Sequence, residues 1–104
     1  MNMNRASISV TGEGHYVVEG ELDMNSVPQL WRSANGFFNT PATSSLVFDL
    51  QAVTRSDSSG LALLIEWMAL ARQNNQTIHF RNLPVQMWEI AKVSDLVDVI
   101  PLEK

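Results

Sequence analysis

The most informative segment of the chain is residues 55–65, RSDSSGLALLI, in which an acid, hydroxyls and a glycine directly precede an apolar run. Asp and Ser are common at the N-terminal ends of helices, so we expect a helix to follow residues 57–60 and to run to about Gln73. The first helical turn leaves four backbone N–H groups unpaired, and the helix dipole favours negative charge there. Asp57, Ser58 or a phosphate on Ser58 would all be stabilised, which makes Ser58 the residue to explain.

On the N-terminal side of this stretch, the patterning predicts a hairpin and a helix. Residues 7–11 alternate between polar and apolar, and residues 16–18 follow a Gly12-Glu13-Gly14 turn signal, which together indicate two antiparallel strands. Asn25 or Ser26 then caps a helix with a proline in its first turn, and this helix is expected to end near Gly36.

On the C-terminal side, two further strands and a third helix are predicted. Residues 46–50 form a continuous apolar run of strand length, which is typical of a strand covered on both faces. Residues 77–81 alternate as another strand, and Pro84 opens a helical segment at residues 85–93. The tail, residues 94–104, is expected to add one short turn before Pro101.

The order of these elements predicts an α/β fold. Crossover connections place helices over a parallel sheet, so we expect a mixed sheet of four to five strands with helices packed mainly on one face. With 104 residues and no linker or internal repeat, residues 1–104 are expected to form a single domain.

Composition excludes several classes of function. The formal net charge is −4, and the seven Lys and Arg residues are scattered singly, so we expect no binding to nucleic acid and none directly to anionic lipid. The absence of cysteine removes disulfides, thiolate catalysis and cysteine-ligated zinc, and it fits a reducing cytosol. The N-terminal residues 1–10 lack an apolar leader, and the longest apolar run, residues 61–65, is far shorter than the roughly 20 residues of a membrane span. We therefore expect a cytoplasmic protein without direct membrane insertion, metal or cofactor.

The residues alone leave the role of Ser58 open. It could be a plain helix cap worth about 1 kcal/mol, a contact or phosphorylation site, or the nucleophile of a small hydrolase. Asp57 is adjacent and is expected to accept backbone amides rather than to act as a base. The only histidines, His15 and His79, lie on predicted strands at spacings that indicate neither a metal pair nor a catalytic elbow.

The helix after residue 60 carries more apolar surface than one buried face needs. At about 100° per residue, its apolar residues fall into two stripes that lie on nearly opposite sides of the helix. The first stripe comprises Leu61, Leu64, Ile65 and Met68, and the second comprises Leu63, Trp67 and Leu70. The second stripe is covered either by the tail or the third helix, or by a partner protein, because aromatic residues are enriched at interface cores. Trp31, at the edge of the first helix, is either core or an anchor beside the Ser58 loop.

These residues resemble a known family, the STAS domains of anti-sigma factor antagonists and sulfate transporters. Residues 57–61, Asp-Ser-Ser-Gly-Leu, are similar to the family motif in which the first hydroxyl accepts phosphate, and this resemblance makes Ser58 the acceptor position. Residues 20–23, Gly-Glu-Leu-Asp, resemble the turn after the second strand, where Asp23 could support the Ser58 loop or merely close a turn. The resemblance covers almost the whole chain and implies the STAS fold.

Within the family, residues 20–31, 60–64 and 90–101 look most like the STAS subunits of Mla-type ABC transport systems, which move phospholipid between the inner and outer membranes. The resemblance implies a non-enzymatic cytoplasmic subunit that binds and regulates an MlaF-like ATPase, in a complex with an inner-membrane permease. The expected contact residues on this chain are Asp23, Trp31, Asp57, Ser58, Ser59, Leu63 and Trp67.

The pair Ser58-Ser59 is more similar to the anti-sigma factor antagonists than to the Mla-type motif. The alternative function is therefore an anti-sigma factor antagonist that a serine kinase switches at Ser58.

Overall fold

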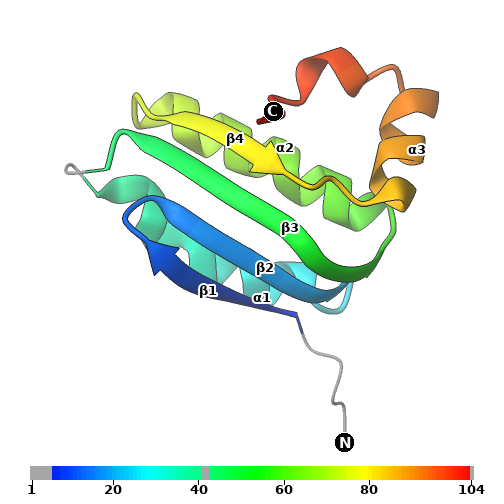
Figure 1. Ribbon diagram of the computed structural model, residues 1–104, viewed down its shortest axis with the longest axis horizontal. Coiled ribbons are helices and arrows are strands. Elements are labelled where there is room, and N and C mark those ends of the chain that lie inside the picture. The colour runs from blue at the N-terminus through cyan, green and yellow to red at the C-terminus, as the bar shows by residue number, and fades with distance from the viewer. Residues whose placement is uncertain (1–5, 41–42, 104) are drawn as a thin grey trace, which may run out of the picture.

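The computed structural model describes residues 6–40 and 43–103, and it contains one four-stranded sheet (Figure 1). The strands are β1 (Ser7–Gly12), β2 (His15–Leu22), β3 (Ser45–Ser56) and β4 (Thr77–Arg81), and they lie side by side in that order. β1 and β2 are antiparallel, whereas β2 with β3 and β3 with β4 are parallel. The predicted hairpin and mixed sheet are thus confirmed.

The helices of the described residues are α1 (Val27–Ala34), α2 (Ser58–Gln73) and α3 (Val85–Val93), with the short 3-10 helices η1 (Asn35–Asn39) and η2 (Val97–Val99). Helices α1 and α2 connect parallel strands as crossovers, and α3 follows the last strand. In Figure 1, α1 and α2 lie behind the sheet, while α3 lies beside the end of β3 from which α2 starts. The expectation of an α/β fold with helices mainly on one face is confirmed, and η2 is the short turn predicted before Pro101.

The helix-covered face of the sheet and the facing helices form the core. Strand residues at alternate positions, such as Val18, Phe48 and Phe80, are fully buried against them. α2 lies between α1 and α3, so it buries apolar side chains in several directions, which explains its surplus of apolar residues. Phe48 stacks on Trp67 with ring centroids 4.5 Å apart, and this pair lies at the centre of the aromatic cluster.

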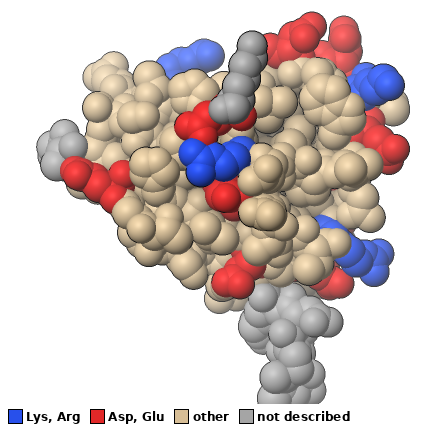
Figure 2. Space-filling model, viewed as in Figure 1, with Lys and Arg blue, Asp and Glu red and all other residues tan. Residues whose placement is uncertain are grey.

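The strand predicted at residues 46–50 is longer and less covered than expected. β3 continues to Ser56, and no helix of the described residues lies on its second face (Figure 1). On that face Val47 is buried, but Asp49 is half-buried and Gln51 is exposed. The prediction of two covered faces was wrong because an apolar run can also arise where one residue, here Val47, is shielded by its neighbours in the sheet. Figure 2 shows this side of the molecule as largely uncharged, with one mixed cluster of charges near its middle.

The two edges of the sheet differ. Outside β4, Leu102 of the tail forms a parallel bridge with Phe80, and Arg81 makes a salt bridge with Glu103. On the outer side of β1, no strand of the described residues pairs with it. No helix within residues 6–40 and 43–103 has the length and hydrophobicity needed to cross a membrane.

Candidate functional site

The candidate site begins where β3 ends and α2 starts. Asp57 is extended and caps α2, and its carboxylate Oδ1 accepts a hydrogen bond from the Ser59 N–H at 2.8 Å. Ser58 is the first residue of the helix and is exposed, while Ser59 is half-buried. The cap is therefore Asp57 and not Ser58, so the hydroxyl of Ser58 is free of the capping role that the sequence left open. The expectation that Asp57 accepts backbone amides is confirmed.

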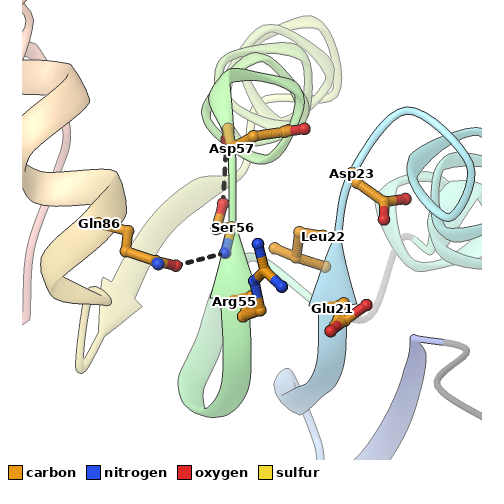
Figure 3. A pocket seen from close by; sticks show the side chains of 7 residues that line it. All are labelled: Glu21, Leu22, Asp23, Arg55, Ser56, Asp57 and Gln86. Atoms are coloured by element: carbon orange, nitrogen blue, oxygen red, sulfur yellow. Dashed lines mark hydrogen bonds between the residues drawn. The ribbon is translucent and has the colours of Figure 1, made fainter.

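Two neighbouring elements, strand β2 and helix α3, hold this start of α2 in place. The Asp57 N–H donates to the Leu22 carbonyl at the end of β2, at 3.1 Å. The Ser56 N–H donates to Oε1 of Gln86 on α3 at 2.8 Å, and the Ser56 hydroxyl donates to the Asp57 carbonyl at 3.1 Å (Figure 3). Strand β2 and helix α3 thus both fix the backbone directly before Ser58.

Gly60 allows α2 to pack closely against these elements. A Cβ atom at this position would lie 2.2 Å from the Ser56 Oγ, 3.1 Å from the Leu22 Cβ and 3.2 Å from the Met87 Cε. Only glycine leaves room for this approach.

Replacing Gly60 with alanine is expected to lower the free energy of unfolding by about 1–2 kcal/mol. A Cβ only 2.2 Å from the Ser56 Oγ places the overpacking cost in the upper part of its range, at about 2–3 kcal/mol, and alanine regains roughly 1 kcal/mol in a helix. Urea denaturation followed by circular dichroism measures this change. The control is Gly36→Ala, since a Cβ there meets nothing within 4 Å. A Gly60→Ala variant as stable as the original chain would contradict the close packing.

Asp23 closes the turn that begins α1. Its carboxylate Oδ1 accepts hydrogen bonds from the N–H groups of Asn25 at 2.9 Å and Ser26 at 3.0 Å, and Ser26 is the N-cap position of α1. Figure 3 places Asp23 on the strand end adjacent to Asp57. Of the two roles that the sequence left open, the hydrogen bonds support the closing of a turn, while the direct link to the Ser58 segment runs through the Leu22 carbonyl.

A polar pocket of about 220 Å³ lies between the ends of β2 and β3 (Figure 3). It is lined by Glu21, Leu22, Asp23, Arg55, Ser56, Asp57 and Gln86. A wider and more apolar groove of about 530 Å³ continues from Asp57 along α3, past Glu89, Ile90 and Val93. Ser58 is therefore next to a surface that is acidic on one side and apolar on the other, which suits contact with another protein.

The α3 part of this surface was missed in the sequence. Met87 and Ala91 of α3 are buried, but 38% of Trp88 is exposed. Val93 is 89% exposed at the groove. The helical period could have predicted this exposed surface, because Val93 faces away from the core when Met87 and Ala91 face toward it.

Leu63 and Trp67 are not contact residues, and this is a correction. Their side chains are 2% and 0% exposed, because both point into the layer between α2 and the sheet. Trp31 is half-buried against the core, so part of its side chain remains accessible. Of the expected contact residues, the structure brings Asp23, Asp57, Ser58 and Ser59 together around the ends of β2 and β3.

The two histidines are separated from Ser58. His15 begins β2 and pairs with Val47, at the opposite end of the parallel strands from the Ser58 segment, and His79 pairs with the same Val47 from β4. Both histidines lie on strands, as predicted, and His15 is exposed while His79 is half-buried. Within the described residues, no group of three or more His, Asp or Glu side chains is arranged to hold a metal ion. Neither histidine is positioned to activate Ser58.

Comparison with known proteins shows two similarities in sequence. A family model described as Mlab, STAS domain matches residues 8–102. The intermembrane phospholipid transport system binding protein MlaB of Escherichia coli (strain K12) is 29% identical over 86 residues, which cover 81% of this chain and 84% of that protein.

Two solved structures have a similar fold. A chain of the Acinetobacter MlaFEDB complex in an ATP-bound conformation matches with a TM-score of 0.77 and 22% identity, covering 93% of this chain and 99% of that one. The anti-sigma factor antagonist SpoIIAA, in its unphosphorylated form, matches with a TM-score of 0.72 and 17% identity, covering 95% of this chain and 88% of that one. The match to the family model spans nearly all of the sequence, and the chain belongs to the Mlab family of STAS domains.

Proposed function

We propose that this chain is the STAS subunit of an Mla-type phospholipid transport system, and that it binds the ATPase subunit of that system and regulates or stabilises it. The observation that carries the proposal is the 29% identity to MlaB over 81% of the chain. The similarity in fold to a chain of the MlaFEDB complex supports it. In this proposal the chain is a non-enzymatic subunit on the cytoplasmic side of the inner membrane, held there by its partner, and the system maintains the lipid asymmetry of the outer membrane.

The proposed contact surface is centred on Ser58. The hydrogen bonds of Asp57 and Ser56 fix the backbone directly before it, so the exposed hydroxyl is carried on an ordered part of the chain. A fixed surface loses little conformational freedom on binding, which favours affinity. Ser59, the Asp23 turn and the accessible part of Trp31 are the other members of the proposed surface, with the apolar groove beside α3 at its border.

Co-expression tests the proposal. The chain is expressed with the Mla-type ATPase and permease of the same genome, and the complex is purified through a tag on the ATPase. We expect co-elution, which requires a Kd of about 1 µM or tighter, near −8 kcal/mol. We also expect the rate of ATP hydrolysis by the ATPase to change when the chain is present. An ATPase that purifies without the chain and hydrolyses ATP at the same rate with or without it would contradict the proposal.

The second candidate is an anti-sigma factor antagonist switched at Ser58. The exposed hydroxyl at a helix N-terminus favours it, because a phosphate there would be stabilised by the helix dipole and would add about −1.5 to −2 charges to a contact surface. The mass of intact protein from its native host distinguishes the two candidates. A phosphorylated form that is lost in Ser58→Ala, together with an anti-sigma kinase gene nearby, would favour the antagonist.

A further inference from the structure

The outer edge of β4 is protected by the tail of the chain. The Phe80 N–H donates to the Pro101 carbonyl at 2.8 Å, and the Glu103 N–H donates to the Phe80 carbonyl at 2.9 Å. The backbone groups that Phe80 would otherwise present to another strand are thereby used within the chain. Covering an edge in this way is one means by which natural proteins prevent unwanted pairing.

The opposite edge, β1, has no such protection among the described residues. It pairs only with β2, and Figure 1 shows it at the outside of the sheet. Natural edge strands are commonly blocked by charged side chains, proline or bulges. The sequence of β1, SISVTG, has no charge and no proline, and its one irregularity lies between Val10 and Gly12, near the hairpin turn. The regular part of the edge is therefore open to a further strand.

The sequence of β1 is also compatible with antiparallel pairing to the β1 strand of a second copy of the chain. Ile8 pairs with Val18 and Val10 pairs with Tyr16, and since Val18 and Tyr16 are buried, Ile8 and Val10 lie on the helix-covered side. In an antiparallel pair of two β1 strands with a two-fold axis at Ser9, Ile8 of each copy faces Val10 of the other. The regular residues 8–10 of each strand form the centre of this register, and its outer Ser7–Thr11 pairs fall at the irregularity between Val10 and Gly12. The pairing covers Val10, which is 62% exposed, and brings no like charges together in a chain whose net charge is −4.

We propose that β1 is a self-association edge, through which two copies of this chain join their sheets into one continuous sheet. Strand β1 contributes no residue to the proposed ATPase contact, so the association and that contact use different residues of the chain. A contact of about five residues per strand is small, so the dimer is weak, with a Kd of roughly 10–1,000 µM, as for interfaces well below the standard size.

Sedimentation velocity of the full chain from about 10 µM to 1 mM, a range set by that expected affinity, measures the association. Val10→Lys is expected to raise the Kd at least about tenfold, because lysine on an edge strand opposes pairing. The matched control is Met24→Lys, which adds the same charge at a residue 75% exposed outside β1 and is expected to leave the Kd unchanged. A monomer throughout the range, or equal association of Val10→Lys and the original chain, would overturn the proposal.

The absence of cysteine allows the register to be tested with single cysteines. In the proposed pairing the two Ser9 residues are opposite each other, with Cα atoms about 4.5–5.5 Å apart, within the range that a disulfide spans. The two Ser7 residues are about 13 Å apart, four residues along the strand. We expect Ser9→Cys to form a covalent dimer at least about ten times faster than Ser7→Cys, a control on the same exposed strand face. Equal rates in non-reducing electrophoresis would overturn the pairing.

Discussion

Replacing Trp67 with alanine is expected to lower the free energy of unfolding by about 3–5 kcal/mol, the largest effect of any single change considered for this chain. The Trp67 side chain is fully buried, stacks on Phe48 and lies 6.4 Å, between ring centroids, from Phe38. Truncation would remove the central ring of the aromatic cluster and leave a cavity that the α2 and β3 backbones cannot close. Urea denaturation followed by circular dichroism measures the loss, and a variant already unfolded in buffer agrees with it.

Two controls separate burial from the mere loss of an aromatic ring. Trp88→Ala removes the same side chain where it is 38% exposed, and we expect it to cost less than half as much as Trp67→Ala. Trp67→Phe keeps a ring on Phe48 and removes an indole N–H that is buried without a hydrogen-bond partner among the described residues, so its cost is expected to stay below about 1.5 kcal/mol. Equal losses for the two alanine variants would contradict the central place of Trp67 in the core.

Replacing Ser58 with glutamate is expected to weaken binding to the co-purified ATPase at least about 100-fold, or about 2.7 kcal/mol. The reason is that a longer, charged side chain would replace a small hydroxyl at the centre of the proposed contact and would lose its hydration there. The fold itself should be unaffected, because Ser58 is exposed, Asp57 provides the cap, and a negative charge is favourable at the helix start. Binding is measured by titration of the purified ATPase, and unfolding in urea confirms intact stability.

The matched control is Gln73→Glu, which exchanges a neutral side chain for the same acid at the exposed C-terminal end of the same helix, about 22 Å away along its axis. We expect unchanged binding for this variant. The variant Ser58→Gln introduces a neutral side chain of similar size to that of glutamate, so it separates the effect of size on binding from that of charge. Undiminished binding of Ser58→Glu combined with Trp31→Ala would exclude the proposed surface while leaving open an ATPase contact elsewhere on the chain.

The elements that could be predicted from the sequence are those set by local signals. Asp57 before an apolar run predicts the start of α2, and Ser26 with Pro28 predicts the start of α1, because capping depends on residues only a few positions apart. The strands of the hairpin follow from alternation around a glycine turn. These signals act within one turn or one strand, so they survive the packing of the whole molecule.

The placement of Leu63 and Trp67 could not be predicted, because it depends on where α2 lies relative to other elements. Periodicity shows that α2 is apolar on several sides, but only its position between α1 and α3 decides which side chains the core encloses. The extension of β3 to Ser56 is similar. Its last residues pair with β2 across a shift in register, and no local pattern in that stretch signals the pairing.

For the candidate site, the motif predicts the position of Ser58 at the start of a helix, but it does not predict the hydrogen bonds that hold this helix start in place. Gln86 is 30 residues from Ser56 in the sequence, and its side-chain hydrogen bond to the Ser56 N–H depends on how α3 packs. Glu21 and Arg55 are also distant in the sequence, and they line the pocket together because adjacent parallel strands end side by side.

The hydrogen bond from the Asp57 N–H to the Leu22 carbonyl has a consequence for motion. Local opening of the α2 start would also have to break the Gln86 bond, and it would free the strand end that leads into the Asp23 turn. We therefore expect the Asp57 and Ser56 amides to exchange with solvent deuterium slowly and together, although the adjacent Ser58 side chain is exposed. The surface that a partner meets would then behave as one cooperative unit, and binding would change its exchange rates as a group.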